Sequence, residues 1–144
     1  MGEARVVCDE RGRIVLPSDY AAAFEGAAEV VIGPAPGGES LYVFPAVAWT
    51  RLVRRLRKAK ADGDAEAGPF LRLYTSLYRR ERVQGAARRV ALTRDLMELA
   101  DLSEGVVLVG RDDRLEVLSE SRWQERFAGI LSETRPLAAK SRWD

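Results

Sequence analysis

Apolar residues along this chain occur in short blocks, which predict an alternation of strands and helices. The strand-like blocks are rich in β-branched or aromatic residues and end at Gly, Pro or acidic turn residues. They cover residues 3–8, 14–16, 28–32, 41–44, 90–92, 106–109 and 115–118. Helical spacing and capping residues predict helices over 18–24, 49–61, 69–78, 93–100 and 119–135, with Thr93 and Ser119 as N-caps.

Three of the predicted helices carry an apolar stripe with helical spacing. The stripes comprise Trp49, Leu52, Val53, Leu56 and Ala59 in the first helix, Phe70, Leu73, Tyr74, Leu77 and Tyr78 in the second, and Trp123, Phe127, Ile130 and Leu131 in the last. Stripes of this kind indicate core or partner-helix contacts rather than a ligand-binding box. We therefore expect both Trp49 and Trp123 to lie in the core rather than to stack on bases.

The first turn of the chain combines turn-forming residues with cations. Asp9 can accept hydrogen bonds from its own backbone, and Gly12 is free to adopt a positive φ. Arg11 and Arg13 flank this glycine, and the apolar strand over 14–16 follows directly. The pattern predicts a tight turn that presents guanidinium groups beside a buried strand.

Composition limits the chemistry that this chain can perform. The chain has 144 residues, of which 47% are apolar and 31% charged, so we expect a globular protein of one domain or two very small ones. It contains no histidine and a single cysteine, Cys8, whose neighbouring acids raise a thiol pKa. We therefore expect that the protein is not an enzyme and that it has no catalytic, cofactor-binding or metal-binding residues. No apolar run is long enough for a membrane span, and a cytoplasmic location is expected.

The small net charge of +1 conceals a basic middle segment. Residues 51–94 hold 13 basic and 4 acidic side chains, whereas acids outnumber bases before and after this segment. Such asymmetry indicates either an anionic partner or an oligomer whose surfaces attract each other. A solvated basic helix face is the simpler interpretation for the helical part. Residues 79–89 are predicted to be a basic, irregular segment. The arginines at 79, 80 and 82 suit a helix C-terminus.

The second half of the chain repeats the first. Residues 13–16 match residues 89–92, and residues 30–32 match 106–108, both at an offset of 76. The next strand and the following tryptophan match at an offset of 74, because the second loop is shorter. Each half has too little core to stand alone. Two halves packed about a pseudo-twofold axis would bury both sets of strands.

The tandem unit and its motif resemble the MraZ family. The motif is Asp9-x-x-Gly12-Arg13-x-x-x-Pro17, and the resemblance extends through Leu41-Tyr42-Val43-Phe44-Pro45, Phe70–Leu77 and Glu116-Val117 to about residue 131. It implies an α+β fold of two tandem swapped-hairpin-like small β-barrel halves of the SpoVT/AbrB type, with pseudo-twofold symmetry and peripheral helices. The corresponding boundaries are 1–60 for the first repeat, 61–80 for a linking helix, 81–131 for the second repeat and 132–144 for a tail.

The resemblance also implies a function. Proteins of this family are DNA-binding transcriptional regulators, and the expected role is repression of a cell-division and cell-wall gene cluster. The implied partners are double-stranded DNA with repeated promoter boxes and further copies of the chain in a ring-like homo-oligomer. The implied location is the nucleoid within the cytoplasm, and no membrane partner is expected.

The candidate DNA-binding residues are Arg13, Arg11, Arg89 and Arg88. Arg13 occupies the family's DNA-binding position, whereas the second motif is degenerate: Gly85, Arg88 and Thr93 replace its Asp, Gly and Pro. An arginine adopts a positive φ less readily than a glycine does. The second turn, with Arg88 in place of the glycine, is therefore predicted to be reshaped.

Two alternatives to DNA contact remain open from the sequence. Arg11 and Arg13 could form structural bonds to Asp9 or Glu10, and the second pair of arginines could serve oligomer contacts. On that interpretation, the protein is an oligomeric scaffold or protein-binding module that has lost specific DNA recognition.

Overall fold

The computed structural model describes residues 3–6, 8–9, 11–16, 24, 28–102 and 105–143. The strands are β1 (Glu3–Val6), β2 (Arg13–Val15), β3 (Glu29–Pro34), β4 (Leu41–Pro45), β5 (Arg79–Arg82), β6 (Arg89–Ala91), β7 (Val106–Arg111) and β8 (Arg114–Ser119). The helices are α2 (Ala46–Ala61), α3 (Ala67–Ser76), α4 (Arg94–Leu99) and α5 (Glu120–Thr134), followed by the short 3₁₀ helix η2 (Arg135–Leu137). The short helix predicted over 18–24 lies outside the described residues, apart from Phe24, which is buried.

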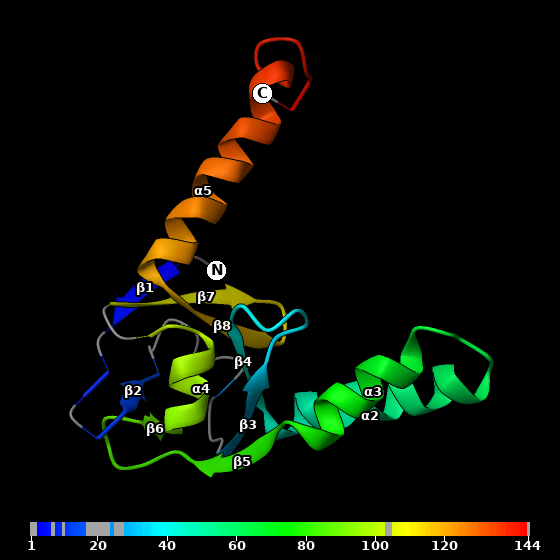
Figure 1. Ribbon diagram of the computed structural model, residues 1–144, viewed down its shortest axis with the longest axis vertical. Coiled ribbons are helices and arrows are strands. Elements are labelled where there is room, and N and C mark those ends of the chain that lie inside the picture. The colour runs from blue at the N-terminus through cyan, green and yellow to red at the C-terminus, as the bar shows by residue number, and fades with distance from the viewer. Residues whose placement is uncertain are drawn as a thin grey trace.

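The chain has an α+β fold built on antiparallel pairing. Six strands form one sheet in the order β1-β7-β8-β4-β3-β5, and β2 pairs with β6 in a separate two-stranded ribbon, here called the β2–β6 ribbon (Figure 1). The strands of the described residues form no closed barrel. Strands from the two halves interleave, because β1 pairs with β7 and β5 pairs with β3. Neither half therefore completes its own part of the sheet.

Two strand pairs join equivalent residues of the repeat. In the β2–β6 ribbon, Ile14 lies opposite Val90, its match at an offset of 76. In the middle of the sheet, Tyr42 of β4 lies opposite Glu116 of β8, its match at an offset of 74. A residue that pairs with its own equivalent lies on the axis relating the two copies, so the register agrees with the internal repeat.

The segment predicted to be irregular, residues 79–89, is partly a strand, so that prediction was wrong. β5 pairs with β3 at the edge of the sheet, and Val83 extends this pairing through a hydrogen bond from its N–H to the carbonyl of Ala28, at 3.0 Å. The side chains of β5 are mostly exposed. Backbone pairing on an edge strand needs no apolar side chains, and charged residues are common there. Hydropathy alone therefore missed this strand.

The main core lies between the six-stranded sheet and the β2–β6 ribbon. Ile14 and Val90 of the ribbon are fully buried against inward-facing residues of the sheet. A second cluster forms where α2 and α3 pack together at one end of the sheet, around Phe44 and Tyr74. Trp49 packs against this second cluster and donates its indole N–H to the carbonyl of Tyr74 at 3.1 Å, as expected for a largely structural tryptophan.

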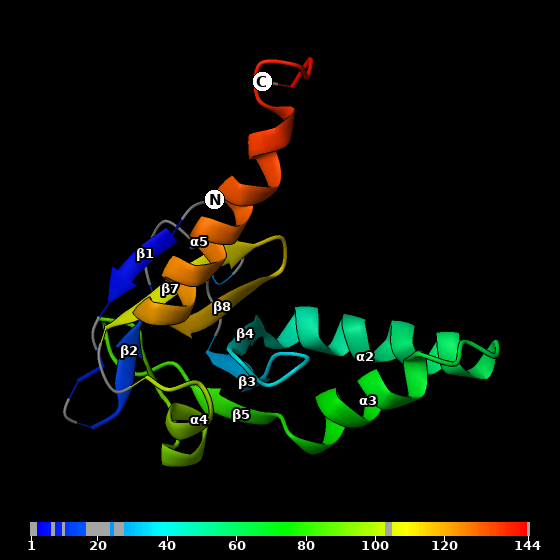
Figure 2. The ribbon, with the colours of Figure 1, turned by 45° about the horizontal axis from the view of Figure 1, so that its top comes forward.

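Two helical projections leave the sheet in different directions. One is the pair α2 and α3, called here the α2–α3 arm, and the other is α5 (Figures 1 and 2). The apolar face of α5 is exposed, so the prediction of a core position for Trp123 was wrong: α5 has no buried residue. Phe127, Ile130 and Leu131 are each about half exposed. Among the described helices, none combines the length and apolar character that crossing a bilayer requires.

A buried carboxylate holds the base of α5. Glu116 of β8 is only 3% exposed and accepts two hydrogen bonds from Arg126 of α5, at 2.6 and 2.9 Å. Ser40 and Arg111 donate to the same carboxylate at 2.6 and 3.1 Å. Burial opposes the charge of Glu116, but the hydrogen bonds from Arg126 and Ser40 outweigh it and hold its pKa below the ordinary value. Ser119 caps the helix, as predicted, by accepting the N–H of Arg122 at 3.1 Å.

We predict that Glu116→Gln lowers the free energy of unfolding by about 1–3 kcal/mol, because it removes charge-assisted hydrogen bonds in a buried site. Urea unfolding at pH 7 measures the change. Glu133→Gln, at an exposed position of α5, is the control and should have little effect.

The difference between wild type and Glu116→Gln should also depend on pH. A pKa that is lowered in the folded state adds stability above the unfolded pKa, near 4.5, and this stability is lost as the pH falls through the folded value. The stability gap should therefore shrink below pH 4.5. A gap that stays constant down to acid unfolding would contradict the proposed role of the charge.

Candidate nucleic-acid interface

The β2–β6 ribbon brings the two basic turns of the chain together. Arg13 lies opposite Ala91, and Arg89 lies opposite Val15, on either side of the central pair Ile14 and Val90. The fold thus places Arg13 and Arg89, which match in the repeat, at symmetric positions of one ribbon. Their surroundings determine what this surface can bind.

The first turn has the geometry that its sequence predicts. Gly12 adopts a φ of +75°, and its N–H bonds to the carbonyl of Asp9 at 3.0 Å. One carboxylate oxygen of Asp9 accepts the N–H groups of Arg11 and Arg13, both at 2.9 Å. A β-carbon added to Gly12 would lie 3.2 Å from the carbonyl oxygen of Leu92, so both conformation and space favour glycine.

Asp9 also forms ion pairs with a guanidinium group of each turn, a close one with Arg13 and a long one with Arg89. Its second carboxylate oxygen lies 2.8 Å from Nε of Arg13 and 3.9 Å from Nε of Arg89. The structural contact considered for Arg13 is therefore present. The backbone N–H of Arg13 contributes most to lowering the pKa of Asp9, and further hydrogen bonds from Arg11 and the Arg13 side chain add to it. The ionised carboxylate thus orients two arginines without removing them from solvent, since their side chains remain 22% and 43% exposed.

The backbone pair that closes the second turn spans one residue more than the pair that closes the first. Gln84 and Arg89 exchange both backbone hydrogen bonds, at 2.7 and 2.9 Å, whereas Asp9 and Arg13 share one backbone bond, at 2.9 Å. Gly85 still corresponds to Asp9 in the turn itself, because its carbonyl accepts the N–H of Arg88 at 3.1 Å as the Asp9 carbonyl accepts that of Gly12 at 3.0 Å. Gly85 has no carboxylate to accept the N–H of Arg89, and the carbonyl of Gln84 accepts it instead.

Arg88 keeps the left-handed conformation that glycine has in the first turn. Its φ is +54°, and its N–H bonds to the carbonyl of Gly85 at 3.1 Å. Its guanidinium donates to the carbonyl of Phe24 at 2.6 Å. This contact ties Arg88 to the body of the protein, so it is the least available of the four candidate arginines.

Two residues at this surface were missed by the sequence reasoning. Gln84 accepts a hydrogen bond from Nη1 of Arg13 at 3.3 Å and so links the two turns. Arg94, at the start of α4, lines the same surface cavity as Arg11 and Gly12. Gln84 carries no sequence signal of its own, because its role follows from the pairing of β2 with β6. Arg94 lies three residues after the end of β6, next to the predicted N-cap Thr93, and this position was the available signal.

The arrangement suits contact with an anionic polymer. Arg11 is exposed, and no ion pair joins it to another described residue. Arg13 and Arg89 lie beside it, oriented by one carboxylate. Guanidinium groups of this kind can neutralise phosphates or form paired hydrogen bonds with guanine. Cys8 is not part of this chemistry, because burial, followed by the charge of Asp9, raises the pKa of its thiol.

Fold and site together define an α+β protein of two interleaved repeats that presents paired basic turns at their junction. No protein-family model matches the chain. It is 32% identical over 133 residues to the transcriptional regulator MraZ of Thiobacillus denitrificans, covering 91% of this chain and 88% of the relative. It is 31% identical over 134 residues to the protein of the same name from Thermus thermophilus, covering 92% and 90%.

A third relative, the transcriptional regulator MraZ of Mycobacterium avium, is 33% identical over 118 residues, covering 81% of this chain and 78% of its own. The chain therefore belongs to the MraZ family. The names of these relatives describe regulators of transcription rather than enzymes.

We predict that Gly12→Ala lowers the free energy of unfolding by about 1–2 kcal/mol, because a β-carbon is unfavourable at a positive φ. The matched control is Gly129→Ala, within α5, where no atom lies within 4 Å of the added carbon. That substitution should raise stability by about 0.5–1 kcal/mol through helix propensity. Urea unfolding checks both, and an unchanged Gly12→Ala protein would contradict the tight turn.

Proposed function

We propose that this chain is a DNA-binding transcriptional regulator that reads promoter DNA with the basic turns of the β2–β6 ribbon. The observation that carries the proposal is Arg13, which is held by Asp9 at the junction of the two repeats. Membership of a family whose relatives are named transcriptional regulators supports it. The two repeats, residues 1–60 and 81–131, are then swapped-hairpin halves of one interlocked unit, with 61–80 as the linking helix and 132–144 as the tail.

Orientation by Asp9 is how the turn would gain specificity. A free arginine loses rotamer entropy when it binds a base edge, whereas Arg13 already has its Nε fixed. One of its Nη groups donates to Gln84, and the side chain keeps 22% of its surface exposed to a ligand. Arg11 and Arg89 supply phosphate contacts beside it. Arg88 has a structural role in this scheme because it bonds to Phe24.

The regulatory role is the part of the proposal that rests on the family resemblance. We infer repression of a cell-division and cell-wall gene cluster, at the nucleoid in the cytoplasm. Repeated promoter boxes are the expected target, since several subunits that each bind one box gain affinity together.

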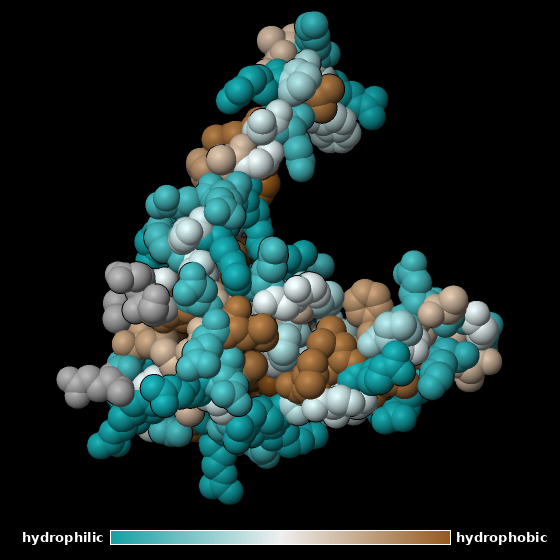
Figure 3. All heavy atoms as spheres, viewed as in Figure 1, coloured by the Kyte–Doolittle hydropathy of each residue, from teal (hydrophilic) through white to brown (hydrophobic). Residues whose placement is uncertain are grey.

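A homo-oligomer, ring-like in the family's manner, is supported by the exposed apolar face of α5. Phe127, Ile130 and Leu131 are about half exposed and lie on one side of a helix without buried residues, and Figure 3 shows apolar side chains at the surface of this projection. Exposed apolar patches of this kind mark interaction surfaces. A second copy of the chain is the proposed occupant, because assembly supplies the repeated DNA-binding turns that repeated boxes require.

A second candidate function is an oligomeric scaffold or protein-binding module that has lost specific DNA recognition. The observation that favours it is that Arg13, Arg88 and Arg89 all have partners within the protein. On this alternative, the arginines stabilise the junction of the repeats and the α5 face alone is functional.

We predict that Arg13→Gln weakens binding to promoter DNA by roughly 5- to 150-fold, the equivalent of about 1–3 kcal/mol for a lost arginine–base contact. The probe is duplex DNA from upstream of the protein's own gene, with a scrambled duplex for comparison. Fluorescence anisotropy over a range of salt concentrations gives both affinities. Circular dichroism checks that the variant is folded. Arg135→Gln, at an exposed position of η2 at the end of α5, is the control.

Unaltered DNA binding by Arg13→Gln at every salt concentration would remove Arg13 from the interface. No affinity of the wild type for any duplex at low salt, together with an intact oligomer, would favour the scaffold instead.

We predict that Phe127→Ser combined with Leu131→Ser weakens self-association at least about tenfold, since buried apolar anchors dominate interface energetics. Sedimentation velocity at several protein concentrations measures the mass. Ser121→Ala combined with Ser132→Ala, on the opposite face of α5, is the control. Retention of the wild-type mass by the first variant would show that α5 is not the assembly surface.

A further inference from the structure

The basic side of α2 is a second cationic surface, separate from the turns. Arg51, Arg54, Arg55 and Lys58 follow one another at i, i+3, i+4 and i+7, so they form one stripe, here called the α2 stripe. All four are exposed. The apolar stripe on the other side of the helix packs against α3 and the end of the sheet. The α2 stripe therefore faces solvent along the whole arm.

No carboxylate within the described part of the chain neutralises this stripe. None of its four cations takes part in an ion pair with another described residue. α2 itself contains no acid. Arg51 lines a shallow cavity together with Asp112 and Asp113. Arg54, Arg55 and Lys58 form the end of the stripe that has no ion pair with a described residue.

Helix stability does not account for this arrangement. Like charges at spacings of three and four residues repel and destabilise a helix. The helix dipole favours cations only in the last turn, where Lys58 and Lys60 lie. Arg51, Arg54 and Arg55 lie before that turn and gain nothing from it. An anionic partner from outside the chain would compensate them.

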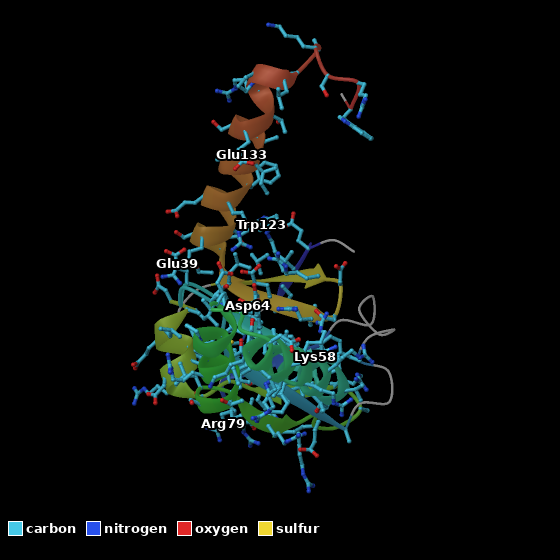
Figure 4. All side chains as sticks on the ribbon, turned by 90° about the vertical axis from the view of Figure 1, so that its right-hand side faces the viewer. Glu39, Lys58, Asp64, Arg79, Trp123 and Glu133 are labelled. Atoms are coloured by element: carbon cyan, nitrogen blue, oxygen red, sulfur yellow. The ribbon has the colours of Figure 1, made fainter. Side chains whose placement is uncertain are left out.

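The stripe lies away from the basic turns. The α2–α3 arm projects from one end of the sheet, whereas the β2–β6 ribbon lies toward the other (Figures 1 and 2). Figure 4 looks onto the end that bears the arm and shows Lys58 there, well apart from Glu133 on α5. The stripe would thus contact a duplex outside the base pairs that the turns face.

We propose that the α2 stripe is a second, sequence-independent DNA contact that binds phosphates flanking the box read by the turns. This inference rests on the proposed function. Four cations within two helical turns span about 10 Å, a length over which one DNA strand presents phosphates about 3.4 Å apart along the axis. A phosphate backbone offers a dense and regularly spaced row of charges that suits this stripe. A second copy of the chain is the alternative that the test below distinguishes.

The test uses the full-length chain and two triple variants with the same change of charge. Arg54→Gln, Arg55→Gln and Lys58→Gln remove the free end of the stripe, and Arg135→Gln, Lys140→Gln and Arg142→Gln change exposed residues at the C-terminal end. Each lost phosphate contact reduces the slope of log affinity against log salt by about 0.9. We expect the stripe variant to lose about 2 to 3 from this slope for each bound subunit and to keep its preference for promoter over scrambled DNA. The control should keep the wild-type slope.

Duplex length provides a second measurement. Trimming the DNA to the box should weaken wild-type binding and have less effect on the stripe variant, whose flanking contacts are already lost. An unchanged salt slope and unchanged length dependence in the stripe variant would overturn the inference while leaving the proposed function intact. Loss of oligomer mass in that variant, with DNA binding per subunit unchanged, would also overturn it and assign the stripe to contacts between copies. Absence of DNA binding by the wild type would instead refute the proposed function.

Discussion

Strand exchange between the two halves of the chain is the constraint on which the rest of the structure depends. The first strand of each half pairs with the other half: β1 joins β7, and β5 joins β3. The two halves meet again at β4–β8 and in the β2–β6 ribbon, where Ile14 lies opposite Val90. Because neither half can bury its own strands, the core forms only when both are in place. The junction of the halves is therefore the most strongly determined part of the molecule, and it is there that the fold presents its arginines.

Asp9 links this architecture to the candidate function. Its carboxylate shapes the first turn through two backbone N–H groups and orients Arg13 and Arg89 through its second oxygen. One residue of the first repeat thus arranges cations from both. The second repeat has no such acid and closes its turn with backbone bonds between Gln84 and Arg89. The two turns occupy matching positions of the repeat but differ in chemistry, which makes the surface asymmetric.

The two projections separate the remaining chemistry in space. α5 carries apolar side chains into solvent and is held at its base by the buried Glu116, whereas α2 carries cations that have no counter-ion among the described residues. A protein with one apolar and one basic projection is suited to self-association through the first and to an anionic partner through the second. The β2–β6 ribbon, toward the end of the sheet away from the arm, supplies the oriented arginines (Figure 1).

The sequence by itself determined the local structure: the Asp9–Gly12 turn, the N-caps at Thr93 and Ser119, most strands and the apolar stripes, because these depend on neighbours within a few residues. It also revealed the repeat and the family. Only the tertiary structure decided that β5 is a strand, that Gln84 closes the second turn, that Arg88 bonds to Phe24 and that the described residues leave the stripe of α5 exposed. These depend on strand register and on contacts between distant residues, which periodicity does not encode. A stripe at helical spacing shows that a face is apolar, but only packing shows whether the chain itself covers that face.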